Sequence, residues 1–155
     1  MGDKRLSANF TLHELTRTDH NDLRMANRAE GAEYEGKLRQ LCLHLMQKIR
    51  NVWGPITITS GYRGAELNKR VGSTDASQHR KGEACDFVLK DMSKENKASF
   101  LEWCKDEADC STMVWHQLLD EGTRFHISLP TGVNDNQIGT WTNKKSGVKS
   151  KKKKK

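Results

Sequence analysis

Two histidines and one aspartate have the types and spacing of a metal site. His79 and Asp86 are separated by six residues, and His126 follows further along the chain. Two imidazoles and a carboxylate supply three ligands to a tetrahedral zinc ion, and an open fourth position is typical of a catalytic zinc site. A water at that position has its pKa lowered toward ~7. The pattern therefore predicts one catalytic zinc ion per chain.

The residues around this pair allow both side chains to reach one ion. Gly82 permits a tight turn after His79, and alternation along a strand places Asp86 on one face of it. A histidine and an aspartate at this spacing also occur by chance, as surface residues that bind nothing. The small residues around the pair and the third donor, His126, favour the metal site.

Longer motifs recur in order along the chain. They are Phe10-Thr11-Leu12-His13-Glu14-Leu15, Thr57-Ile58-Thr59-Ser60-Gly61-Tyr62-Arg63, Leu67-Asn68, Val71-Gly72, Ser77-Gln78-His79, Gly82, Ala84, Asp86, Gln117-Leu118-Leu119 and His126-Ile127-Ser128. This series resembles the zinc D-alanyl-D-alanine carboxypeptidase and L-alanyl-D-glutamate peptidase family, especially its small phage and prophage members. The resemblance covers residues 10–129 and implies an α+β fold, in which a small antiparallel sheet packed with helices carries the zinc site, as in DD-peptidases and hedgehog-like domains.

The resemblance also implies a function and roles for other residues. It implies a zinc metallopeptidase that cuts peptidoglycan stem peptides, of the L-Ala–D-Glu endopeptidase or D-Ala-D-Ala carboxypeptidase type. Arg63 would stabilise the oxyanion or bind the substrate carboxylate, although it could instead form a surface salt bridge. Ser77 and Gln78 would hydrogen-bond the substrate peptide.

The general base is the point at which this chain departs from the family. Relatives often place a carboxylate three residues before the last zinc histidine, and Thr123 at that position cannot accept a proton. Small phage members have the pattern Gln-Leu-aliphatic-x-Glu before this turn, and residues 117–121 match it. We therefore predict Glu121 as the base, with Asp120 as the alternative. Both acids could instead be solvated residues of a hairpin tip. His116 stands where relatives commonly have aspartate, and could orient a ligand or be exposed.

Periodicity and capping signals predict the elements that position these residues. A capping box at Thr11–Glu14 predicts a short helix, and the polar stretch 18–28 predicts a loop. An apolar stripe predicts a helix over 33–53 that ends at Gly54. Strands are expected over 56–60 and 83–89, helices over 65–70 and 94–107, and a hairpin formed by 113–119 and 124–129. After Pro130 the pattern fades, with Ile138 and Trp141 expected to dock on the core.

The charge is concentrated at the C-terminus. The net charge is +7, and six lysines lie within 146–155, so residues 1–145 carry only about +1. We expect a zinc peptidase domain over 1–145 and a disordered lysine-rich tail over 146–155, drawn to anionic cell envelopes. A solubilising or engineered tail is the alternative. Nothing in the tail can recognise bases, so no specific nucleic-acid partner is expected.

Length and composition agree with a monomeric enzyme of one domain. The 155 residues are long enough to bury a core, and no apolar run approaches the ~18 residues of a membrane span. Residues 1–6 lack the apolar stretch of a secretory signal. Together with these features, the resemblance to small phage members implies an endolysin-like protein that waits in the host cytoplasm and reaches the wall once the membrane is breached.

Two other classes of function stay open at this point. A noncatalytic wall- or partner-binding module on the same fold would explain the absence of an acid at Thr123. A nucleic-acid-binding protein would depend on the lysine block at 151–155 for its activity.

Overall fold

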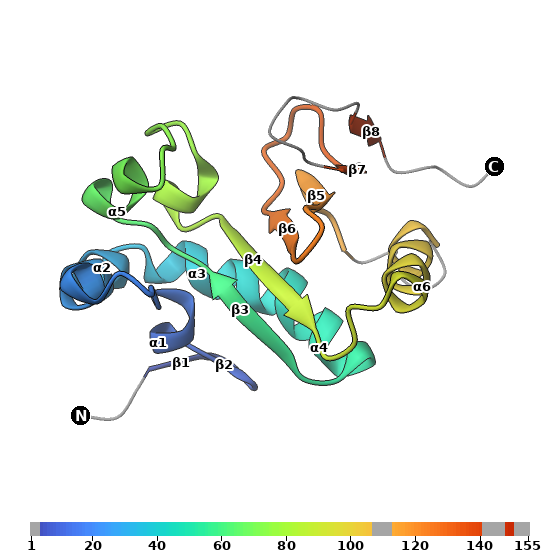
Figure 1. Cartoon of the computed structure of the whole chain (residues 1–155), viewed down its shortest axis with the longest axis horizontal. Helices are drawn as coiled ribbons and strands as arrows, with labels where there is room; N and C mark the ends of the chain where they lie inside the picture. Colours follow the sequence, from blue (N-terminus) through green and yellow to red (C-terminus); the bar gives the residue numbers. More distant parts are fainter. Residues whose placement is uncertain (1–3, 107–112, 141–147, 151–155) are drawn as a thin grey trace.

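A six-stranded sheet forms the centre of the computed structural model, which describes residues 4–106, 113–140 and 148–150, the last three by backbone only (Figure 1). The strand order is β3 (Ile56–Ser60), β4 (Ala84–Leu89), β6 (Phe125–Ser128), β5 (Gln117–Asp120), β7 (Gln137–Thr140) and β8 (Val148–Ser150). Adjacent strands are antiparallel except β5 and β7, which are parallel. The predicted α+β class is therefore confirmed, with one parallel pair in the sheet.

The N-terminal segment forms a small ribbon and a capped helical turn. Strands β1 (Arg5–Ser7) and β2 (Phe10–Thr11) pair with each other and lead into α1 (Leu12–Leu15). The Thr11 hydroxyl accepts from the Glu14 amide, and the Glu14 carboxylate accepts from the Thr11 amide. This is the predicted capping box, and it fixes the start of α1.

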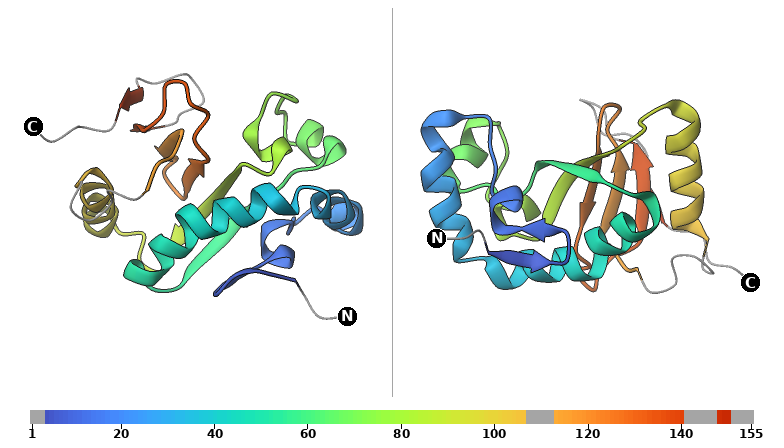
Figure 2. Two further views of the ribbon diagram at one scale, coloured as in Figure 1. Left: turned by 180° about the vertical axis from the view of Figure 1, so that it is seen from behind. Right: turned by 90° about the horizontal axis from the view of Figure 1, so that it is seen from below.

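A long helical rod covers one face of β3 and β4 (Figure 2). It consists of α3 (Glu35–Leu41), the π-helical segment η2 (Cys42–Met46) and α4 (Gln47–Trp53), and it ends before Gly54 as predicted. Its fully buried residues repeat the apolar stripe of the sequence: Leu38, Leu41, Cys42, Leu45, Met46 and Ile49. Burial of this stripe against the sheet stabilises both elements.

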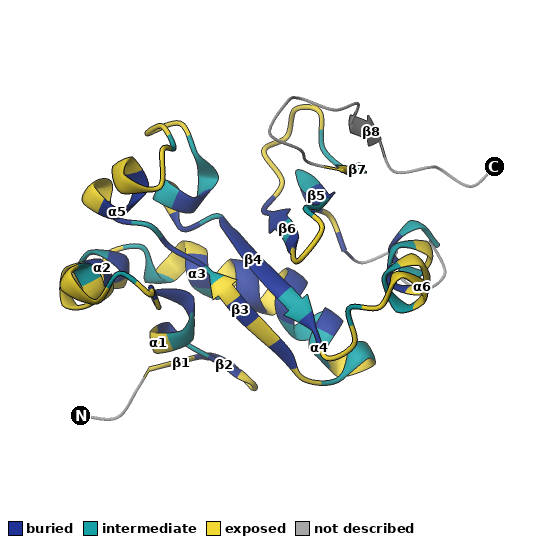
Figure 3. Cartoon of the chain, in the orientation of Figure 1, coloured by how far each residue is buried: buried dark blue, intermediate teal, exposed yellow. Residues whose placement is uncertain are grey.

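Aromatic side chains join α6 (Lys94–Lys105) to the same face of the sheet. The Ser93 hydroxyl caps α6 by accepting from the Asn96 amide. Phe100 of α6 packs against Phe125 of β6 and Phe87 of β4, with ring centroids 4.9 and 6.1 Å away. These contacts fix which face of β4 and β6 points into the core, and Figure 3 shows β4 buried along most of its length.

The segment 18–28, predicted as a loop, is largely helical. Residues Asn21–Leu23 form a 3-10 turn, η1, and Arg24–Ala32 form the helix α2. This prediction was wrong because α2 has no apolar stripe, and the only residues that it buries are Asn27 and Gly31. Tertiary hydrogen bonds rather than an apolar face hold the helix in place.

The remaining connections follow the predictions in part. Helix α5 (Ala65–Arg70) has the predicted bounds, whereas the expected 72–78 loop leads into a 3-10 turn, η3 (Gln78–Lys81). Strand β5 begins only at Gln117, later than predicted. After Pro130, where the sequence pattern fades, the chain forms β7, and Ile138 of that strand is buried as expected. Trp141 lies outside the described residues.

The C-terminal region is described only in part. Strand β8 falls within the stretch expected as a tail, while the lysine block 151–155 lies outside the described residues, so the boundary at 145/146 stays a prediction. Within the described part of the chain, no helix has the length and apolarity required to cross a membrane.

The aromatic cluster yields a prediction about stability. Phe100→Ala should lower the free energy of unfolding by about 3–5 kcal/mol, because it removes a fully buried ring that contacts both β4 and β6. Val52→Ala serves as a control, since Val52 is 59% exposed and should change stability by about 0.5 kcal/mol or less. Urea unfolding monitored by circular dichroism measures both, and equal effects would contradict the assigned core.

Candidate metal centre and substrate groove

Strands β4 and β6 bring two of the predicted ligands face to face. Asp86 and His126 are direct cross-strand partners in the antiparallel register. Their neighbours Phe87 and Phe125 point to the opposite face and are fully buried in the core. The His126 Nδ1 lies 2.9 Å from the Asp86 Oδ1. Strand alternation therefore places this pair on the face away from the aromatic cluster.

The third predicted ligand, His79, comes from η3 rather than from the sheet. The Ser77 hydroxyl caps η3 by accepting from the His79 amide, and Gly82 ends it with a φ of +72°. The His79 Nδ1 donates to the Gly61 carbonyl at 2.8 Å, so the Nε2 is left facing the Asp86 Oδ1 at 3.2 Å. A carbonyl on one imidazole nitrogen orients the other nitrogen for metal binding.

The three side chains converge well enough to hold one metal ion. One donor atom from each of His79, Asp86 and His126 lies within 4.8 Å of the others. Burial lowers the pKa of His79, which favours the neutral, metal-binding imidazole. Burial acts to raise the pKa of Asp86, but hydrogen bonds with His126 and His79 outweigh it and hold that pKa well below its usual range. Two imidazoles beside an ionised carboxylate are a donor set that fits zinc.

A groove of about 620 Å³ opens over these donors, a volume within the range of ligand-binding sites. Its lining includes all of the first-choice site residues but not the alternative base, Asp120: Arg63, Ser77, Gln78, His79, Asp86, Glu121 and His126. Sequence positions spread over more than sixty residues are thus brought to one surface. Their chemical roles remain predictions.

Glu121 and Arg63 lie beside the metal ligands. The Arg63 Nη2 is 3.8 Å from the Asp86 Oδ2, and Glu121 lines the groove with its side chain only 13% exposed. Burial, and then the charge of Asp86, raise the pKa of Glu121 above its usual value, as suits a general base. Asp120 instead bonds the Lys97 ammonium at 3.2 Å and the Gly122 amide at 2.9 Å, and it is not part of the groove lining.

The proposed substrate-binding residues also have structural contacts. The Ser77 hydroxyl caps η3, and the Gln78 Nε2 donates to the Leu129 carbonyl at 3.1 Å. These contacts fix η3 against the end of β6. His116 lines the groove, but its Nδ1 lies 3.1 Å from the Asp135 Oδ1, so its pairing is with the 131–136 loop.

Arg124, which also lines the groove, was missed by the sequence analysis. The Arg124 Nε lies 3.0 Å from the Glu121 Oε1 and 3.6 Å from the Asp86 Oδ2. The signal was present, because Arg124 stands two residues before His126 and a strand period of two places both on one face. Arg124 therefore joins the candidate base to the metal ligands.

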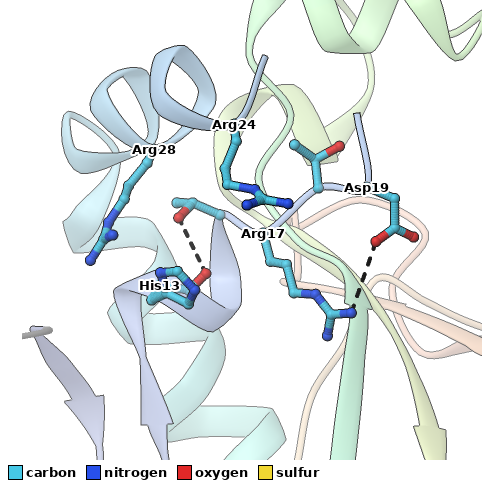
Figure 4. Close-up of a pocket in the computed structure, with 7 residues that line it drawn as sticks. His13, Arg17, Asp19, Arg24 and Arg28 are labelled. Carbon is cyan, nitrogen blue, oxygen red and sulfur yellow. Dashed lines mark hydrogen bonds and ion pairs between the residues drawn. The ribbon is translucent and has the colours of Figure 1, made fainter. Parts of the chain in front are cut away.

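A smaller hollow of about 280 Å³ lies on the α1 and α2 side of the molecule (Figure 4). Basic residues dominate its lining: His13, Arg17, Arg24 and Arg28. Arg24 and Arg28 leave α2 in different directions, and the Arg17 Nη2 is 3.9 Å from the Asp19 Oδ1 (Figure 4). None of the predicted site residues lines this hollow, so the candidate catalytic site is the larger groove.

Comparison with known proteins agrees with this geometry. The sequence profile described as Peptidase M15 matches residues 8–115, which is more than half of the chain. The match contains Arg63, His79 and Asp86 and ends before Glu121 and His126. The assignment of those two residues to the site therefore rests on the geometry of the groove, not on this match. A comparison with curated proteins gives no match.

The convergence of donors yields a prediction about metal. Metal-free protein should take up about one zinc ion per chain and gain thermal stability, because an ion that binds only the folded state stabilises it. His126→Ala should lose both effects, whereas His44→Ala should keep them, since His44 is exposed on η2 and lies outside the donor cluster. Elemental analysis and thermal denaturation with and without chelator measure this. Full zinc occupancy in His126→Ala would refute the ligand assignment.

Proposed function

The chain belongs to the Peptidase M15 family of zinc peptidases, and on that premise we propose that it hydrolyses peptide bonds in the stem peptides of peptidoglycan. The observation that carries this proposal is the convergence of His79, Asp86 and His126 in a groove that also contains Glu121 and Arg63. The sequence resemblance to small phage members supports peptidoglycan as the substrate. In that role the protein would act on the cell wall as an endolysin does.

The groove suits an extended peptide that carries carboxylates. Its lining includes the cations Arg63, Lys81 and Arg124, which can bind carboxylates of the substrate at separate points. Arg63 is 16% exposed and Arg124 47% exposed, so the first is set deep beside Asp86 and the second lies near the rim. This difference in depth between the two arginines suits a peptide that lies along the groove and carries more than one carboxylate.

Each groove residue has a role in the proposed hydrolysis. Zinc bound by His79, Asp86 and His126 would supply a Lewis acid that polarises the scissile carbonyl and acidifies water. Glu121 accepts a proton from the attacking water and donates it to the leaving amine. Arg63 stabilises the negative charge that develops on the carbonyl oxygen. Stabilisation of this charge needs a guanidinium held in place, and the 3.3 Å hydrogen bond from the Arg63 Nε to the Ser60 hydroxyl helps to hold it.

The substrate is tested directly on purified peptidoglycan. Incubation should release peptide fragments, identified by mass spectrometry, and chelator should abolish the release because the metal site is emptied. The masses also distinguish cleavage between L-Ala and D-Glu from removal of a terminal D-Ala. Sedimentation with the wall but no release of fragments would contradict hydrolysis and favour a noncatalytic binding module.

The general base gives a separate prediction. Glu121→Gln should keep zinc and fold but lose hydrolysis by ~10²–10⁴-fold, because the amide cannot accept the proton of the attacking water. Asp120→Asn is the matched control, since Asp120 bonds Lys97 outside the groove and should keep most of the activity. Rates of fragment release with zinc-loaded variants measure both. If Asp120→Asn is the inactive variant, the assignment of the base is wrong.

A further inference from the structure

Helix α2 buries polar rather than apolar groups against the site. Asn27 is 2% exposed, and Glu30 follows it by three positions, on the same side of the helix. Neither side chain lines the groove. Asn27 nevertheless contacts the turn that carries Arg63, and Glu30 contacts both that turn and η3, which carries His79.

The Asn27 amide fastens α1 to the turn that follows β3. Its Nδ2 donates to the Thr16 carbonyl at 2.7 Å and to the Tyr62 carbonyl at 3.0 Å. Its Oδ1 accepts from the Gly64 amide at 2.6 Å. Both amide hydrogens and the oxygen are therefore used, and the turn is held on both sides of Arg63.

The Glu30 carboxylate fastens the same turn to η3. Its Oε2 accepts from the Tyr62 hydroxyl at 3.0 Å and from the Ala65 amide at 3.2 Å. The same oxygen is 3.2 Å from the Arg80 Nη2, and Arg80 is the neighbour of His79. Arg80 also donates to the Tyr62 hydroxyl at 2.8 Å, which closes the network.

The fastened turn sets the orientation of a metal ligand. The Gly61 carbonyl accepts from the His79 Nδ1 at 2.8 Å, and the Arg63 amide donates to the His79 carbonyl at 3.0 Å. The position of Gly61 thus decides which imidazole nitrogen carries the proton and where the other nitrogen points. A displaced turn would turn the His79 ring away from Asp86.

Close packing shows that the turn has little freedom to sit elsewhere. A Cβ on Gly61 would lie 2.3 Å from the Leu15 carbonyl oxygen, and a Cβ on Gly64 would lie 2.5 Å from the Glu30 Oε1. The Tyr62 amide donates to that same Leu15 carbonyl at 2.7 Å. Gly61 is required because a Cβ there would meet the Leu15 backbone, whereas a Cβ at Gly64 would meet only the ends of side chains of α2, which could shift.

We propose that Asn27 and Glu30 are positioning residues for the metal site, acting on His79 through the Gly61 carbonyl and through Arg80. The inference rests on the proposed function, because it presumes that His79 binds a metal ion. Partners of metal ligands commonly change metal affinity by about 10–100-fold when they are lost. The polar face of α2 is then part of the metal centre, although none of its side chains contacts the ion.

The test compares two substitutions with a matched control. Asn27→Asp keeps the acceptor for Gly64 but removes both amide donors, and Glu30→Gln removes the charge that pairs with Arg80. Gln47→Glu makes the same amide-to-acid change at a network of α4 that joins Ser7 and Asn9, away from the groove. All three should lose stability, so stability alone does not discriminate them.

Metal affinity supplies the discriminating measurement. The zinc dissociation constant of each folded variant is obtained by competition with a chromophoric chelator, and the absorption spectrum of bound Co²⁺ reports the ligand geometry. Asn27→Asp and Glu30→Gln should each weaken zinc binding by about tenfold or more and alter the Co²⁺ spectrum. Gln47→Glu should match the unmodified protein in both.

The outcomes separate this inference from the proposed function. An unmodified protein that binds no zinc would refute both. Tight zinc binding by the unmodified protein together with an unchanged dissociation constant and spectrum in Asn27→Asp would refute the positioning role alone. Should Asn27→Asp fail to fold, Glu30→Gln decides the question, because Glu30 is 33% exposed and its replacement leaves no buried charge.

Discussion

The pairing of β4 with β6 is the constraint on which the candidate site depends. Its register sets Asp86 opposite His126 on one face and Phe87 opposite Phe125 on the other. A slip by one residue would send His126 toward the core and an aromatic ring into the groove. Phe100 of α6 contacts both rings, so the packing that stabilises the sheet also selects the register that assembles the donors.

Charge balance explains why so many polar side chains surround one carboxylate. Asp86 is only 4% exposed, and an isolated charge at that depth is costly unless it is paired. Its Oδ1 lies 2.9 Å from the His126 Nδ1 and 3.2 Å from the His79 Nε2, while Arg63 and Arg124 face its Oδ2 at 3.8 and 3.6 Å. A zinc ion held by Asp86 and the two imidazoles would take over part of this compensation.

The third donor depends on a different kind of stabilisation. His79 stands on a short 3-10 turn, which lacks the hydrogen-bond ladder that fixes a strand. Its position follows from polar contacts that run from α2 through the turn at Gly61. Side-chain amides and carboxylates give directional contacts that an apolar surface cannot, and a metal ligand needs its orientation fixed as well as its location.

The sequence by itself determined the elements with a strong local signal and pointed to the candidate donors. The apolar stripe over 33–53, the strand 56–60 and the helix 65–70 all follow from periodicity and from end signals such as Gly54. His79, Asp86 and His126 were recognisable from residue type, spacing and family resemblance. The helices and strands depend on neighbours within a few positions, which a single sequence displays directly. The candidate donors are further apart, and the order of the family motifs linked them.

Only the tertiary structure decided the contacts that join distant segments. Helix α2 was missed because its stability comes from Asn27 and Glu30 bonding to a turn more than thirty residues away, and no periodic pattern records that. Glu121 was separated from Asp120 only when β5 and β6 placed the first in the groove and the second beside Lys97. Arg124 was likewise recognised as a site residue only because the structure places it beside Glu121 and Asp86. Long-range packing determines which of several plausible polar residues meet, because chain closure brings together groups whose proximity no local rule encodes.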